Sequence, residues 1–127
     1  MEFEAFYKKG QKRAEYQDFL KCGNLDLKAN EFFIGQSNSD VVVLCDGMGG
    51  LRDGDIASEF VANEFSKLSI EAGKTSEDEI RSNVLTTHEA LINFSKGRFG
   101  FTCMGSTLCA VLQSKRYIWI VNVGDTR

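Results

Sequence analysis

A short apolar run followed by an aspartate and a glycine-rich turn is the part of this chain most suited to chemistry. Residues 41–45 (VVVLC) are five consecutive apolar residues, three of them β-branched, which predicts a short strand buried on both faces. Asp46 follows directly, and four of the next eight residues are glycines. Carboxylate and backbone carbonyl oxygens are the ligands that Mg²⁺ and Mn²⁺ prefer. The stretch therefore predicts a divalent metal site, and a strand-to-helix turn capped by Asp46 is the alternative.

Several segments in the order found here resemble the type 2C family of metal-dependent Ser/Thr protein phosphatases, in their bacterial-like form. They extend from about residue 10 to residue 127, so the resemblance covers nearly the whole chain and does not depend on one glycine cluster. The segments are a loop with Arg13, Gln17 and Asp18 at the family's spacing, DGMGG at 46–50 with Gly54, MGSTL at 104–108, and NVGDTR at 122–127.

The resemblance implies specific roles for individual residues. It makes Arg13 and Asp46 catalytic, with Arg13 gripping the substrate phosphate, a task that suits a guanidinium fork. It implies metal contacts from Asp18, Asp46 and Gly47, and places Asp125 close to an additional metal. The implied cofactors are a pair of Mg²⁺ or Mn²⁺ ions, with a third near Asp125.

Simpler interpretations of some of these residues remain open on local grounds. Arg13 alone would be a solvated surface arginine, and Asp125 could be a turn aspartate at a strand end. Many eukaryotic members of the family carry a histidine after the Asp-Gly pair, proposed as the general acid, whereas this chain has Met48 there. The single histidine, His88, lies on the apolar stripe of an expected helix, so we expect it to be packed or half-buried there and not catalytic. The general acid is unassigned.

Composition limits the classes of partner. The chain has 127 residues, enough for one domain, with 43% apolar and 26% charged residues. Its formal net charge is −3 with mixed signs throughout, so we expect no nucleic-acid partner. No apolar run reaches the length of a membrane span, so we expect no membrane partner. The four cysteines form no C-x-x-C pair and are expected to be reduced core residues of a cytoplasmic protein.

The remaining patterns predict the elements that position these residues. Apolar residues recur at helical spacing from Ile56 to Leu68, with Ala72-Gly73-Lys74 ending that helix. Ser76 and Glu79 form a capping box that starts a second helix, which runs to about Lys96 before a loop at 97–100. Strands are expected at 2–7, 19–22, 31–35, 41–45, 104–112 and 117–123.

The resemblance implies an α+β fold of the α/β/β/α sandwich type, in which two mostly antiparallel sheets are flanked by helices. We expect residues 1–127 to be the incomplete N-terminal part of one such domain, because the family continues into Asp-Gly and Asp-Asn motifs that complete the metal centre. By itself the chain should therefore be inactive. Strand 117–123 should also be an unpaired edge, which predicts self-association.

Two function classes follow. In the first, the parent protein is a metal-dependent serine/threonine phosphatase that hydrolyses phosphoserine and phosphothreonine in phosphorylated proteins through a metal-activated water. In the second, the chain is a catalytically dead, phosphatase-like binding or regulatory module. The retention of Arg13, Asp18, Asp46 and Gly47 favours the first, since a dead domain has no physical need for a carboxylate cluster.

Overall fold

A five-stranded antiparallel sheet forms the centre of the computed structural model. Its strand order is β3-β2-β5-β6-β7, so β5, which ends at Asp46, is the central strand. The strands are β2 (Asp18–Cys22), β3 (Leu25–Leu27), β5 (Val41–Asp46), β6 (Leu108–Gln113) and β7 (Ile118–Val123). The structure describes residues 2–8, 16–23, 25–27, 31–36, 40–48, 53–67 and 75–126.

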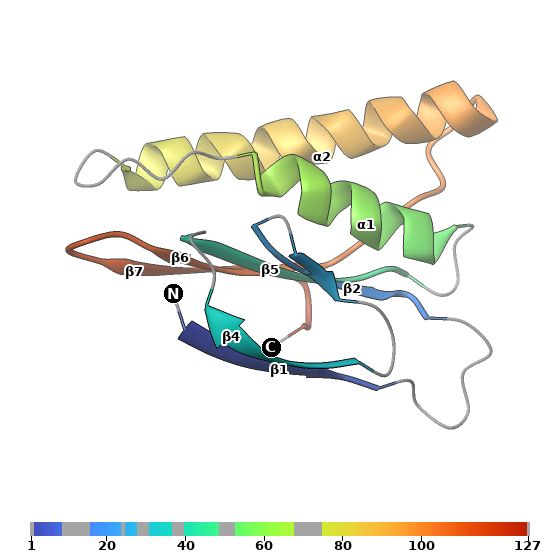
Figure 1. Ribbon diagram of the computed structural model, residues 1–127. Coiled ribbons are helices and arrows are strands. Elements are labelled where there is room, and N and C mark those ends of the chain that lie inside the picture. Colours follow the sequence, from blue (N-terminus) through green and yellow to red (C-terminus); the bar gives the residue numbers. More distant parts are fainter. Residues whose placement is uncertain are drawn as a thin grey trace.

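Two helices cover one face of this sheet, as Figure 1 shows. They are α1 (Gly54–Phe65) and α2 (Glu77–Phe99). The core lies between the helices and the sheet, where the fully buried side chains of Val43, Phe65 and Leu112 meet. Because side chains alternate along a strand, one face of β5 packs against the helices and the other faces away. The pattern of β5 follows this rule, with Val41, Val43 and Cys45 buried and the residues between them less so.

A second, two-stranded sheet lies on the face opposite the helices (Figure 1). It consists of β1 (Glu2–Tyr7) paired antiparallel with β4 (Glu31–Gln36). The chain therefore supplies a helical layer and strands of two separate sheets. This arrangement confirms the predicted α+β class and fits an incomplete α/β/β/α sandwich.

The start of α2 confirms the predicted capping box. The Ser76 hydroxyl accepts from the Glu79 N–H at 3.3 Å, and the Ser76 N–H donates to Glu79 Oε2 at 2.8 Å. The predicted end was wrong, because α2 continues through residues 97–99. It ends at Phe99 and is followed by Gly100, whose φ of 79° and N–H bond to the Lys96 carbonyl are typical of a helix C-terminus.

Two other expected boundaries differ, and one short strand was not expected. The strand expected from Met104 begins at Leu108, because residues 105–107 instead bond to the end of β5. The α1 helix ends at Phe65 and residues 66–67 form a turn, so the expected helix was too long; Leu68 and the expected end at residues 72–74 lie outside the described residues. Strand β3 was not predicted, since its three residues are too short to show periodicity. In the part of the chain that the structure describes, no helix is both long and apolar enough to cross a membrane.

Candidate metal centre

Two of the predicted metal residues face each other across neighbouring strands. Asp18 begins β2, Asp46 ends β5, and the two are direct partners in the antiparallel pair. Directly opposed residues in such a pair have Cα atoms about 4.5–5.5 Å apart and side chains on the same face. Since Cys45 is buried toward the helices, alternation directs Asp46 to the opposite face. Both aspartates are exposed.

The turn after Asp46 requires glycine at position 47. A Cβ atom built on Gly47 would lie 1.7 Å from the carbonyl oxygen of Gly54, at the start of α1. The Gly47 N–H donates to the Gln17 carbonyl at 2.8 Å, and Gly47 also forms an isolated bridge with Ser106. The backbone between β5 and α1 is thus packed directly against the residue before Asp18.

Residues 106 and 107 hold the backbone of Asp46. The Asp46 N–H donates to Thr107 Oγ1 at 2.9 Å, and the Thr107 N–H donates to the Asp46 carbonyl at 2.9 Å. The Ser106 hydroxyl also donates to that carbonyl, at 3.2 Å. Among the described residues, no side chain or backbone group bonds to the Asp46 carboxylate. The backbone of Asp46 is therefore fixed while its carboxylate faces solvent.

Asp125 lies in the turn that follows β7, close to this network. The turn needs Gly124, whose φ of 102° is strained for other residues. The Thr126 hydroxyl lies 2.6 Å from Thr107 Oγ1, and Asn122 Nδ2 donates to the Thr126 carbonyl at 2.6 Å. Asp125 itself is exposed. Its turn is therefore bonded to the residue that also holds Asp46.

The structure brings some predicted residues together and not others. Among the described residues, no three His, Cys, Asp or Glu side chains lie close enough to hold one metal ion, so Asp125 does not join the Asp18–Asp46 pair in a three-residue cluster. Arg13 lies outside the described residues. His88 is exposed on α2, so the expectation that it would be packed or half-buried was wrong. The roles of Thr107 and Thr126 were not predicted, although both lie in the family-like segments 104–108 and 122–127, because a hydrogen bond between distant segments leaves no spacing pattern in a sequence.

The thiol next to the aspartate belongs to the core. Burial raises the pKa of Cys45 to about 12, the nearby Cys109 adds to this rise, and a hydrogen bond with Ser106 opposes it. A thiol with so high a pKa stays protonated, and only the thiolate is a good nucleophile or metal ligand. All four cysteines of the chain are free. Cys45 is therefore a packing residue of β5.

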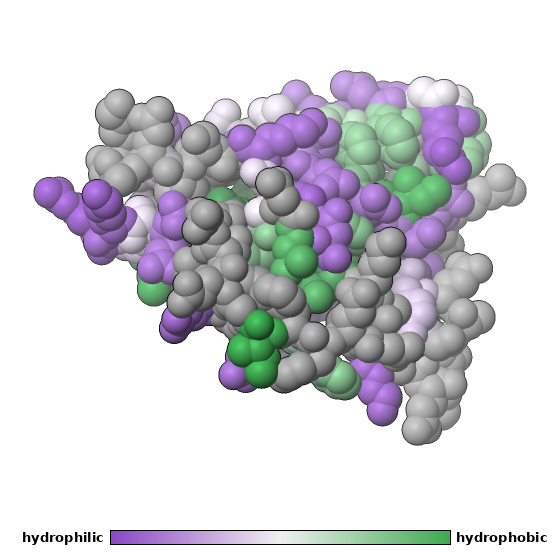
Figure 2. Space-filling view, in the orientation of Figure 1, coloured by the Kyte–Doolittle hydropathy of each residue, from purple (hydrophilic) through white to green (hydrophobic). Residues whose placement is uncertain are grey.

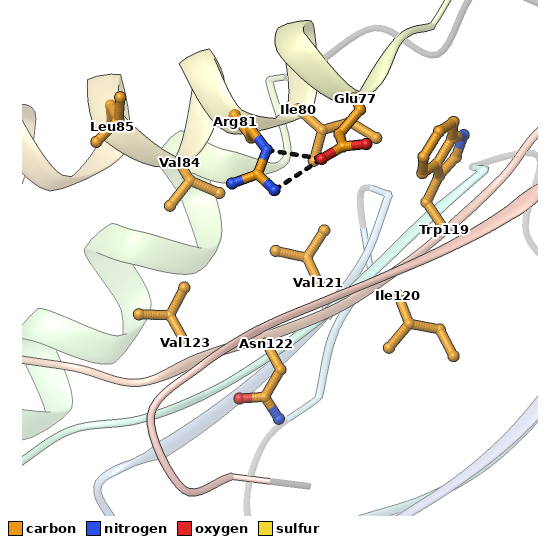
Figure 3. A pocket seen from close by; sticks show the side chains of 10 residues that line it. All are labelled: Glu77, Ile80, Arg81, Val84, Leu85, Trp119, Ile120, Val121, Asn122 and Val123. Carbon is orange, nitrogen blue, oxygen red and sulfur yellow. Dashed lines mark hydrogen bonds and ion pairs between the residues drawn. The ribbon is translucent and has the colours of Figure 1, made fainter.

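A hollow lies away from the carboxylates, between α2 and β7 (Figure 3). Its volume is about 470 Å³, and Val84, Trp119 and Val121 belong to its mainly apolar lining. In Figure 3, Val121 points toward α2, whereas Ile120 and Asn122 point to the other side of the strand. An ion pair between Glu77 and Arg81, with a closest distance of 2.7 Å, lies at its helical side. Among the described residues β7 is the last strand of the sheet, so this hollow lies at a sheet edge.

The donor set at the Asp18–Asp46 edge fits a hard divalent cation. Mg²⁺ is commonly held by one or two carboxylates, with water and phosphate oxygens completing its shell. Like charges directly opposite each other on a sheet destabilise it, so a cation between two opposed carboxylates relieves repulsion. The geometry can therefore bind a cation and present it to a phosphate group at the solvent edge.

Comparisons with known proteins find protein phosphatases among the relatives of this chain. No family model matches the chain. The serine/threonine phosphatase stp of Listeria welshimeri is 29% identical over 100 residues, which cover 75% of this chain and 40% of the relative. A Streptococcus pyogenes protein that carries the name of a 2C-type protein phosphatase is 28% identical over 122 residues, covering 93% of this chain and 45% of the relative. The chain thus spans less than half the length of these relatives.

A solved structure extends the likeness to the fold. The catalytic domain of the serine/threonine protein phosphatase PstP, in complex with two manganese ions, matches with a TM-score of 0.72 and 23% identity. The match covers 98% of this chain and 48% of that one. The comparisons therefore confirm the predicted resemblance: over most of its length, this chain is similar to about half of bacterial proteins named as serine/threonine or 2C-type protein phosphatases.

Proposed function

We propose that residues 1–127 are the N-terminal part of a single metal-dependent protein serine/threonine phosphatase domain. The observation that carries the proposal is the direct opposition of Asp18 and Asp46 beside a turn that admits no side chain at Gly47. The names of the relatives support the reaction class. The manganese ions of PstP support metal dependence, and Mg²⁺ or Mn²⁺ both suit the carboxylates present.

Each residue of the proposed site has one task. Asp18, Asp46 and the Gly47 carbonyl would hold a pair of divalent ions, and Asp125 would contact a third. Bound metal of this kind supplies a water of lowered pKa for in-line attack on phosphorus. Arg13 would bind the phosphate oxygens through its guanidinium fork and orient the phosphoryl group. Asp46 suits its task because its backbone is fixed by two hydrogen bonds to Thr107.

The proposed partner is a phosphorylated protein carrying phosphoserine or phosphothreonine. The relatives' names support this substrate class. An acidic chain with charges of both signs gives no support to a nucleic-acid partner. Four free cysteines are typical of a reducing compartment, which supports a cytoplasmic location.

Metal binding tests the site with a matched control residue next to the other end of β5. Mn²⁺ is titrated into the chain by calorimetry, alongside Asp46→Asn and Asp40→Asn. Asp40 is also an exposed aspartate but lies at the opposite end of β5. We expect weak binding by the parent, loss of binding in Asp46→Asn, and parental binding in Asp40→Asn. Equal Mn²⁺ binding by all three proteins, or no binding by the parent, would show that Asp46 is not a metal ligand in this chain.

Activity separates the phosphatase from a catalytically dead binding module. We expect no Mn²⁺-dependent hydrolysis of an aryl phosphate by the chain alone, because about half the length of its relatives is not represented in it. A chimera of this chain with the second half of the Listeria phosphatase should hydrolyse the aryl phosphate. The Asp46→Asn substitution should abolish that hydrolysis. A folded chimera that binds a phosphopeptide without any turnover would favour the binding module.

Among the described residues, no strand pairs with the outer edge of β7, and this edge supports a further proposal, self-association with a second copy of the chain. Strand β7 contains no charge and no proline, the features that usually protect an edge. Exposed hydrophobic residues include Ile118 and Ile120, at 68% and 76%. Antiparallel pairing about Ile120 would set Ile118 opposite Asn122 of the second copy, with no like charges opposed. Hydrophobic side chains also reach the surface on the face seen in Figure 2.

A further inference from the structure

The position of Asp46 depends on a residue to which sequence analysis assigned no role. Thr107 is 7% exposed and lies between the Ser106 bridge and the start of β6. Its N–H donates to the Asp46 carbonyl, and its hydroxyl oxygen accepts from the Asp46 N–H, both at 2.9 Å. One threonine thus satisfies both polar backbone groups of the aspartate.

The same hydroxyl reaches a third segment of the chain. Thr107 Oγ1 lies 2.6 Å from Thr126 Oγ1, and either hydroxyl can donate. A hydroxyl has one proton and two lone pairs, so Thr107 can accept from Asp46 and still bond to Thr126 in either direction. Valine has the same shape as threonine but can neither donate nor accept a hydrogen bond through its side chain, whereas the serine hydroxyl can do both.

The Thr107 methyl group also contacts the turn that carries Asp125. A Cβ built on Gly124 would lie 2.9 Å from Thr107 Cγ2, so the turn backbone packs closely on this side chain. Asn122 fixes the far side of the turn through its 2.6 Å bond to the Thr126 carbonyl. Asp125 stands between Gly124 and Thr126, both of which meet Thr107.

From these contacts we propose that Thr107 is a positioning residue, which sets the relative placement of Asp46 and Asp125 without touching the metal. This inference rests on the metal site of the proposed function and adds to it a coupling between the carboxylate at the end of β5 and the carboxylate in the turn after β7. Groups that orient metal ligands typically contribute ten- to a hundredfold to metal affinity. Without the hydroxyl, the part-buried Asp46 N–H loses its acceptor, and the turn that carries Asp125 loses its side-chain bond to Thr107.

The test compares Mn²⁺ affinity in Thr107→Val, Thr107→Ser and Thr87→Val, measured well below their melting temperatures. Thr87 is a buried threonine of α2, so its valine variant controls for a general change in the core. We expect binding about ten- to a hundredfold weaker in Thr107→Val and near-parental binding in the other two. A Thr107→Val protein that binds Mn²⁺ like the parent would overturn the proposal.

A double-mutant cycle tests the coupling to Asp125. If Thr126 acts through the position of Asp125, Thr126→Val should weaken Mn²⁺ binding in the parent but have little further effect in an Asp125→Asn background. Additive losses would contradict the coupling.

Amide hydrogen exchange decides the role of Thr107 even if the chain binds no metal. The Asp46 amide should exchange slowly in the parent and in Thr107→Ser, and much faster in Thr107→Val. Absence of Mn²⁺ binding by the parent would refute the proposed metal site. Unchanged exchange of the Asp46 amide in Thr107→Val would refute the positioning role itself.

Discussion

Replacing Gly47 with alanine should damage the candidate metal centre through backbone packing alone. The new Cβ would lie 1.7 Å from the Gly54 carbonyl oxygen, whereas ordinary contact begins near 3.4 Å, so the two backbones must separate by about 1.7 Å. Overpacking of this kind costs about 1–3 kcal/mol. Separation would also strain the 2.8 Å bond from the Gly47 N–H to Gln17, worth about 1 kcal/mol. We expect the free energy of unfolding to fall by about 2–4 kcal/mol.

Gly97→Ala provides the matched control for this substitution. Gly97 lies within α2, and a Cβ there meets no atom within 4 Å. Alanine should therefore raise the free energy of unfolding by about 0.5–1 kcal/mol, since glycine is the poorer helix former. Urea unfolding followed by circular dichroism measures both variants. If Gly47→Ala were as stable as the parent, the close approach of β5 and α1 would be wrong.

Three further predictions concern pH, helix capping and the sheet edge. As pH rises above about 9, the Cys45 thiol ionises in the unfolded chain, whereas in the folded chain its pKa is raised to about 12 and it keeps its proton. The free energy of unfolding should therefore fall by up to about 1.4 kcal/mol per pH unit in the parent. It should fall less steeply in Cys45→Ala, measured over the same pH range. Ser76→Ala should lower the free energy of unfolding by about 1 kcal/mol through loss of the cap, whereas Ser82→Ala, in the exposed middle of α2, should not lower it. Ile120→Lys should lower the molar mass measured by light scattering toward that of a monomer, and an unchanged mass would exclude association through β7.

The sequence predicted the elements whose patterns are local. The apolar run ending at Cys45 identified the central strand, and the Ser76 capping box located the start of α2. Both depend on residues within one element, so periodicity and side-chain type are sufficient. The end of α2 was misplaced because Gly97 suggested a loop, although glycine within a helix costs only about 1 kcal/mol and is tolerated when the helix packs on a sheet.

The site was predictable only in part, for a related reason. Asp46 and Asp18 were identified by chemistry and by family spacing, but their direct opposition depends on the register between β2 and β5. Register arises from long-range pairing that no local pattern records. The role of Thr107 depends on a hydrogen bond to Asp46, which lies 61 positions earlier in the chain. The role of Thr126 depends on its contact with Thr107, which lies 19 positions earlier.

The exposure of the two opposed carboxylates explains how such a site can form before any metal binds. Water screens like charges at an exposed strand end, so the repulsion between Asp18 and Asp46 is small enough for backbone hydrogen bonds to offset it. The same exposure limits affinity, because a cation held there by two protein carboxylates keeps most of its water. Tight binding therefore requires further oxygen ligands that approach the same edge. The fixed backbone of Asp46 supplies geometry, and additional ligands must supply most of the binding free energy.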